Sequence, residues 1–132
     1  MSIESKGLEM QFSKINWLFI IWLIALIFVL VGSLIPVTHV PGVSLLVTDK
    51  VQHAAAYFLL GITALYSGQS ILKKILMYLV SFSIGVAIEF LQPFTGRHFE
   101  INDIVANSAG LFVSLLVYLV VMRKKQRRAT AN

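Results

Sequence analysis

Four long apolar segments dominate this sequence of 132 residues. They cover residues 17–35, 51–71, 75–91 and 103–122, and short polar stretches separate them. A helix of about 20 apolar residues crosses the hydrocarbon core of a bilayer. Backbone groups in lipid must pair within their own segment, which favours the α-helix as the spanning structure. The sequence therefore predicts an all-α fold in a single domain, residues 1–132: an integral membrane bundle of four transmembrane helices.

The composition supports a membrane protein. The chain is 58% hydrophobic and 13% charged, whereas soluble domains are about 45–50% apolar and about 25% charged. The first apolar segment is too long for a signal peptide and lacks a convincing cleavage site, so we expect it to be retained. The chain contains no cysteine, which excludes disulfides and thiol chemistry.

Prolines and small residues indicate how the first two spans are arranged. Pro36 and Pro41 are expected to end the first span, because proline lacks the N–H that a helix interior needs. Residues 37–48 are then expected to form a loop. The second span is the least apolar and is rich in alanine and glycine, which permit close helix packing, so we expect it to be central. The face of the first span that carries Trp17 and Trp22 is expected to meet lipid.

Polar residues set the remaining boundaries. Lys73 and Lys74 are expected to form a short hinge before the third span. Asn102 or Asp103 is expected to cap the fourth span, since its side-chain oxygen can accept from unpaired backbone N–H groups. The fourth span is expected to stop at the basic run 123–128, which suits an anchor attracted to anionic lipid.

The basic residues sort to one side of the predicted spans. Nine of the 11 lysines and arginines precede the first span, lie between the second and third, or follow the fourth; the other two are Lys50 and Arg97. The positive-inside rule then predicts a multi-pass protein of the cell membrane with both termini in the cytoplasm. A nucleic-acid partner is not expected, because the basic residues flank spans rather than forming one binding surface.

Most other polar residues lie at the opposite, outer ends of the spans. Asp49 and His53 are four residues apart and therefore share a helix face. The fourth span carries a stripe at steps of four, three and four that comprises Asp103, Asn107, Gly110 and Ser114. Glu89 and Gln92, three residues apart, lie at the end of the third span. Three helix ends thus present polar faces that can converge into a pocket. Simple ion pairs, capping and interhelical hydrogen bonds are the alternative reading of these residues.

Glu89 lies about one turn inside the third span, about 4–5 Å deep by the helical rise. Ionisable groups within a membrane are costly, face the bundle interior and are functional candidates by default. We therefore expect Glu89 to point into the bundle and to contact His53, Arg97 or Asp103. His53 and Glu89 are the candidate catalytic groups, and a register-fixing bond between them is the structural alternative.

A metal or cofactor is not expected from the sequence. Asp49, His53, Glu89 and Asp103 offer carboxylate and imidazole ligands, but no histidine pair at helical spacing accompanies them. His39 and His98 are expected in solvated loops. No serine nucleophile motif and no glycine-rich phosphate loop occurs.

The ordered set of polar residues resembles the VanZ-like membrane protein family. The resembling motifs are Asp49-Lys50-x-x-His53, Glu89-x-x-Gln92, Gly96-Arg97 and Asp103-Ile-x-x-Asn107-x-x-Gly110, and they span about half of the chain. The resemblance implies a small multi-span protein associated with resistance to the glycopeptide teicoplanin. It implies as binding positions Asp49, Lys50, His53, Glu89, Gln92, Arg97, Asp103 and Asn107. The chain departs from the family at Ser114, where a second glycine is frequent.

Three functions remain open at this point. The first is a protein that binds or modulates a lipid-like or lipid-linked envelope amphiphile, or a lipoglycopeptide, at the outer polar pocket. The second is a membrane enzyme acting on an envelope lipid or precursor, with His53 or Glu89 as general base. The third is a structural protein whose polar residues hold the bundle together. Membrane lipids are the expected partners, and the sequence leaves the oligomeric state open.

Overall fold

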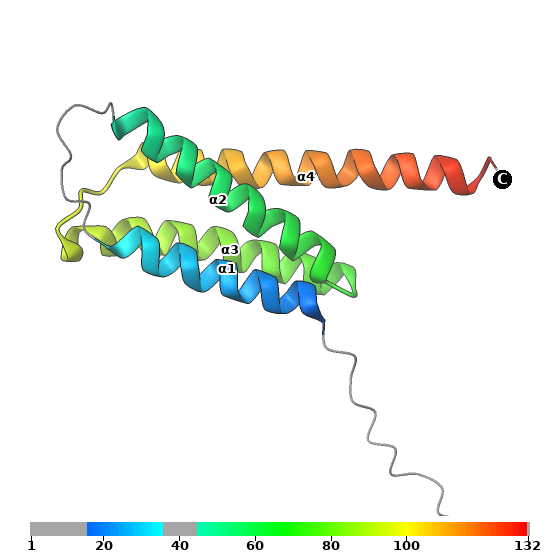
Figure 1. Ribbon diagram of the computed structural model, residues 1–132, viewed down its shortest axis with the longest axis horizontal. Helices are drawn as coiled ribbons and strands as arrows, with labels where there is room; N and C mark the ends of the chain where they lie inside the picture. The colour runs from blue at the N-terminus through cyan, green and yellow to red at the C-terminus, as the bar shows by residue number, and fades with distance from the viewer. Residues whose placement is uncertain (1–15, 36–44, 132) are drawn as a thin grey trace, which may run out of the picture.

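The described part of the chain forms four α-helices that pack side by side (Figure 1). The structure is a computed structural model that describes residues 16–35 and 45–131, without the side chains of residues 45–48. The helices are α1 (Trp17–Leu34), α2 (Leu45–Ser67), α3 (Ile71–Leu91) and α4 (Ile101–Ala129), with a short 3₁₀ helix, η1 (Gln92–Thr95), after α3. The described part of the chain contains no strand, so the predicted all-α fold is confirmed.

Successive helices run in opposite directions (Figure 1). The start of α1 and the end of α4 consequently lie at the same end of the bundle, and α4 extends beyond the other helices there. Three segments, α1, α3 with η1, and α4, are long and apolar enough to cross a membrane. Large apolar side chains face outward along them, with Trp17 68% and Phe28 78% exposed. Such a surface is expected of an integral membrane bundle, because lipid solvates it.

Helix α2 is the central element of the bundle. It packs against each of the other three helices, and its contact with α4 is the most extensive in the structure. Two glycines permit this approach: a Cβ at Gly110 would overlap the carbonyl oxygen of Ala54, and a Cβ at Gly61 would overlap the Ser114 hydroxyl. Ser114 stands where the VanZ-like family frequently has glycine. Gly61 on the facing helix α2 leaves room for the Ser114 hydroxyl.

The boundaries of α2 and α3 differ from those expected. Helix α2 begins at Leu45, inside the expected loop, so Asp49 and Lys50 are helical. Residues 36–44, with the two prolines and the histidine expected there, lie outside the described residues. Helix α3 begins at Ile71, because the Ser70 side chain accepts a hydrogen bond from the backbone N–H of Lys73 at 3.3 Å. Lys73 and Lys74 therefore form the first turn of α3, and the expected hinge is wrong.

Helix α4 is longer at both ends than the sequence suggested. Glu100 occupies the N-cap position without a side-chain capping bond, so the expected cap by Asn102 or Asp103 is wrong. The helix continues through the basic run 123–128 to Ala129. Lysine and arginine are good helix formers, and their charges are favourable near a helix C-terminus.

One aromatic residue of α1 faces inward against expectation. Trp22 is 6% exposed, and its indole N–H donates to the Ser81 hydroxyl of α3 at 3.1 Å. The tryptophan therefore belongs to the core between α1 and α3, whereas Trp17 faces outward as expected. The buried apolar cluster comprises Trp22, Leu26, Val29, Tyr57, Leu60, Ala64, Ile88 and Leu111.

Candidate functional site

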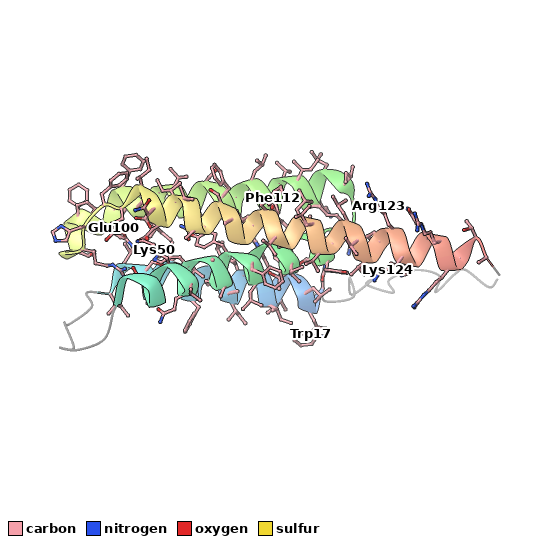
Figure 2. All side chains as sticks on the ribbon, turned by 90° about the horizontal axis from the view of Figure 1, so that it is seen from above. Trp17, Lys50, Glu100, Phe112, Arg123 and Lys124 are labelled. Carbon is pink, nitrogen blue, oxygen red and sulfur yellow. The ribbon has the colours of Figure 1, made fainter. Side chains whose placement is uncertain are left out.

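Charged and polar side chains meet at the end of the bundle where α2 and α4 begin. Figure 2 shows Lys50 and Glu100 together at this end, and Arg123 and Lys124 toward the opposite end. The polar cluster, as we call it, comprises Asp49, Lys50, His53, Arg97, Glu100, Asp103 and Asn107, which hydrogen bonds and ion pairs connect. Six of these seven residues are binding positions that the resemblance implies, and the seventh is Glu100.

Lys50 connects α2 to the start of α4. Its ammonium Nζ lies 2.6 Å from Glu100 Oε2 and 2.7 Å from Asp103 Oδ1. The Asp103 side chain is buried, whereas Lys50 and Glu100 are partly exposed. The lysine thus compensates a buried carboxylate that would otherwise be costly. This contact is possible because α2 begins early enough to present Lys50 from its second turn.

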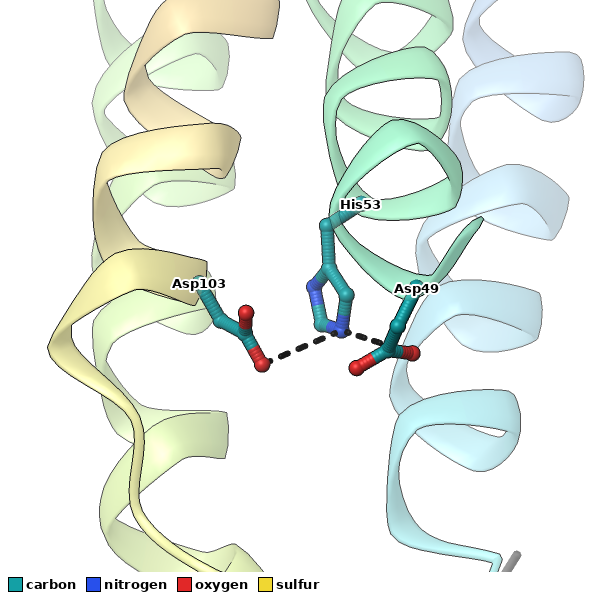
Figure 3. Close-up of side chains that lie close together, drawn as sticks. All are labelled: Asp49, His53 and Asp103. Atoms are coloured by element: carbon teal, nitrogen blue, oxygen red, sulfur yellow. Dashed lines mark ion pairs between the residues drawn. The ribbon is translucent and has the colours of Figure 1, made fainter. Parts of the chain in front are cut away.

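His53 lies between two carboxylates and is itself buried (Figure 3). Its Nε2 atom is 3.9 Å from Asp49 Oδ1 and 3.8 Å from Asp103 Oδ2. Its other ring nitrogen, Nδ1, is 3.0 Å from Asn107 Oδ1. Spacing of four residues on each helix produces this arrangement, because Asp49 with His53 and Asp103 with Asn107 each share one helix face. The two faces meet along the tight α2–α4 contact.

A left-handed glycine positions Arg97. Gly96 ends η1 with φ of 81°, a conformation that glycine adopts without steric cost. The chain then turns so that Arg97 Nη2 lies 3.4 Å and 3.5 Å from the two carboxylate oxygens of Asp49. These distances exceed the usual 2.7–2.9 Å of charge-assisted hydrogen bonds. Arg97 therefore pairs loosely with Asp49.

Glu89 is fully buried, at 0% exposure, yet neither carboxylate oxygen has a hydrogen-bond partner among the described residues. Glu89 is therefore directed into the bundle, as expected. The expected polar contact with His53, Arg97 or Asp103 is not among the hydrogen bonds of the described residues. Other buried polar atoms without such a partner are Tyr57 Oη, Gln92 Oε1 and Asn107 Nδ2. A buried unpaired carboxylate opposes folding, so Glu89 is a candidate for a role other than stability.

Gln92 and His98 stand apart from the polar cluster. The Gln92 amide donates to the backbone carbonyl of Ser33 at 3.3 Å, so this buried residue joins η1 to α1. The structure therefore does not bring Gln92 to the implied binding positions. His98 is exposed, as expected for a residue of a solvated loop.

A pocket of about 340 Å³ opens beside the polar cluster, between α1 and α2. Asp49, His53 and Arg97 supply its polar side, and Phe28 and Val29 supply apolar walls. Its other lining residues are Gly32, Ser33, Gln52, Ala56 and Tyr57. The sequence did not assign residues of α1 to the site. The signal that could have found them is the Gly32-Ser33 pair, the only break in the apolar character of that helix.

Comparisons with known protein families, curated proteins and solved structures found no match to this chain. The resemblance to the VanZ-like family therefore rests on the polar residues and their order along the chain. The geometry of the polar cluster and the adjacent pocket carries the functional inference instead.

Proposed function

We propose that this chain binds or modulates a lipid-like or lipid-linked envelope amphiphile in the pocket between α1 and α2. The supporting observation is the combination of Asp49, His53 and Arg97 on one side of the pocket with Phe28 and Val29 on another. A molecule with a polar head and an apolar tail matches such a surface. The volume of about 340 Å³ also falls within the range of small-molecule sites, about 300–1,000 Å³.

Arg97 is the proposed contact for an anionic headgroup. A guanidinium binds phosphate or carboxylate through two parallel hydrogen bonds. Its loose pairing with Asp49, at 3.4 Å and 3.5 Å, leaves this capacity available. The apolar tail would pass along Phe28, whose side chain is largely exposed on the outer surface of the bundle.

The proposed orientation places the pocket at the outer face of the cell membrane and both termini in the cytoplasm. The Lys/Arg bias supports it, with nine of the 11 basic residues on the terminal side of the predicted spans. The pocket would then meet envelope lipids, lipid-linked precursors or a lipoglycopeptide from outside. We further propose membership of the VanZ-like family and a contribution to teicoplanin resistance, since this drug is an amphiphile of the same kind.

A membrane enzyme acting on an envelope lipid or precursor is the second candidate. The observation that favours it is His53, a buried imidazole that also lines the pocket. A general base must lie within hydrogen-bond reach of the proton that it removes. His53 would meet this condition for a headgroup bound in the pocket, because it lines the pocket. Glu89 is the alternative base. The third possibility, a purely structural cluster, is favoured by the ion pairs of Lys50 with Glu100 and Asp103.

Gly32 permits a direct test of amphiphile binding. Gly32 lines the pocket, and a Cβ at this position would meet no atom within 4 Å, so a side chain can be added to the pocket wall there without a clash at its Cβ. Native mass spectrometry of the purified protein should detect a co-purifying lipid on the wild type and at least tenfold less on Gly32→Phe. The matched control is Val31→Phe, at an exposed position that does not line the pocket. Equal lipid occupancy in both variants would contradict the proposal.

A further inference from the structure

We propose that Asp49, His53 and Asp103 form a binding site for a divalent transition-metal ion, with Zn²⁺ the best fit. One imidazole nitrogen and two carboxylate oxygens, one from each residue, lie within 4.8 Å of one another. The imidazole points between the two carboxylates, one on its own helix and one on α4 (Figure 3). Imidazole and carboxylate are both established ligands of Zn²⁺.

The distances within the group fit a shared ion better than hydrogen bonds. His53 Nε2 lies 3.9 Å from Asp49 Oδ1 and 3.8 Å from Asp103 Oδ2. Both distances exceed the 2.7–3.2 Å of an N–H···O hydrogen bond. Two ligands at about 2.1 Å from one tetrahedral Zn²⁺ are about 3.4 Å apart. The two distances to the imidazole exceed this spacing by only a few tenths of an ångström, and all three ligand atoms lie within 4.8 Å of one another.

The surroundings hold each ligand as a metal site requires. A metal-ligating histidine donates its other ring N–H to a carboxylate or carbonyl oxygen, which orients the ring. His53 Nδ1 lies 3.0 Å from such an oxygen, Asn107 Oδ1. In the tautomer that carries its proton on Nδ1, the lone pair on Nε2 faces the carboxylates. Lys50 holds Asp103 through Oδ1 and leaves Oδ2 toward the imidazole. Arg97 holds Asp49 loosely.

Glu89 provides an independent indication of a cation. Its carboxylate is fully buried, and neither oxygen has a hydrogen-bond partner among the described residues. With His53 neutral, the formal charge of the polar cluster together with Glu89 is −2, because four acids accompany only Lys50 and Arg97. A divalent cation would neutralise this charge.

The proposed ion would lie beside the pocket, because Asp49 and His53 also line it. Three protein ligands leave a coordination position for water or for a group of the bound molecule, as in catalytic zinc sites. No metal was expected from the sequence, because the sequence contains no histidine pair at helical spacing. The third ligand comes instead from α4, 50 positions beyond His53 along the chain. The metal site does not depend on the pocket binding an amphiphile.

Zinc binding by the full-length protein, purified in detergent and stripped with a chelator, tests the site. Titration of Zn²⁺ against a chromogenic chelator should show one tight ion per chain for the wild type. The variants His53→Gln and Asp49→Asn should bind at least 100-fold more weakly. Asn107→Leu, which removes the partner of Nδ1, should weaken binding by about 10–100-fold. The matched control is His98→Gln, which removes an exposed histidine outside the site and should bind as the wild type does.

Two results would overturn the metal site. One is a wild type that takes up no Zn²⁺ from the chelator. The other is wild-type affinity in both His53→Gln and Asp49→Asn, which would place the ion elsewhere. Asp49 is only half-buried, so Asp49→Asn keeps the test valid if His53→Gln does not fold. A shift of the thermal midpoint on adding Zn²⁺ to the wild type, absent in Asp49→Asn, gives a second readout.

Discussion

His53 Nδ1 lies 3.0 Å from Asn107 Oδ1, and this buried contact joins the central helix α2 to α4. Each residue sits four positions beyond an aspartate on its own helix, so the contact also orients the two carboxylates that face the imidazole. The helices can meet this closely because Gly110 lies one turn further along α4, against the backbone of Ala54. Close packing and the polar site are therefore two consequences of the same α2–α4 interface.

We expect Asn107→Leu to destabilise the protein by about 1–3 kcal/mol, because it leaves a buried imidazole nitrogen without its hydrogen-bond partner. The thermal midpoint in detergent measures this effect. Asn102→Leu is the control, since Asn102 lies on the exposed side of the same helix end. Equal midpoints for the two variants would show that the contact contributes nothing to stability.

Gly110→Ala is expected to destabilise the bundle by about 1–3 kcal/mol, because the added methyl group meets the carbonyl of Ala54, which cannot move aside. Gly32→Ala should instead be neutral or stabilising by up to about 1 kcal/mol, since alanine is the better helix former and the space around Gly32 is open. Thermal unfolding of the two variants in the same detergent provides the comparison. A similar loss of stability in both would contradict the close α2–α4 packing.

Glu89→Gln should leave the free energy of unfolding within about 1 kcal/mol of wild type, because no described side chain forms a bond that is lost. Arg97→Ala should cost about 0–1 kcal/mol, as expected for a loose, partly exposed ion pair. Arg97→Ala should nevertheless abolish the phenotype if Arg97 binds the headgroup, and Glu89→Gln should do so if Glu89 is the general base. The measurements are thermal stability in detergent and teicoplanin susceptibility of an expressing strain.

Loss of folded protein in both Glu89→Gln and Arg97→Ala would mean that these groups are structural, and the pocket proposal would then be withdrawn. Asp103→Asn is the matched comparison for a carboxylate that does form an ion pair. It should lower the thermal midpoint more than Glu89→Gln does, because Lys50 loses a charged partner at 2.7 Å.

The orientation in the membrane can be tested with single cysteines, because the chain has none of its own. In intact cells an impermeant thiol reagent should label His98→Cys, in the exposed turn before α4, and should not label Thr130→Cys, at the end of α4. Permeabilised cells serve as the control, in which both positions should react. The reverse labelling pattern in intact cells would place the pocket on the cytoplasmic side.

The sequence alone determined the helical architecture and which residues gather at one end of it. Apolar runs of membrane-spanning length leave the backbone no alternative to the helix in lipid. Spacing of four residues fixed which side chains share a face, so the pairs of Asp49 with His53 and of Asp103 with Asn107 are recognisable from the order of residues. These are local properties, because each depends on one helix only.

Only the tertiary structure decided how the helices are rotated and which charged groups meet. Lipid is as apolar as a protein core, so hydrophobicity does not mark the inner face of a spanning helix, and the inward position of Trp22 was missed for this reason. The pairing of Lys50 with Glu100, the wall that α1 contributes to the pocket, and the unpaired burial of Glu89 depend on several helices at once. Contacts between residues some 50 positions apart are set by packing, and the third proposed metal ligand, Asp103, reaches His53 in this way.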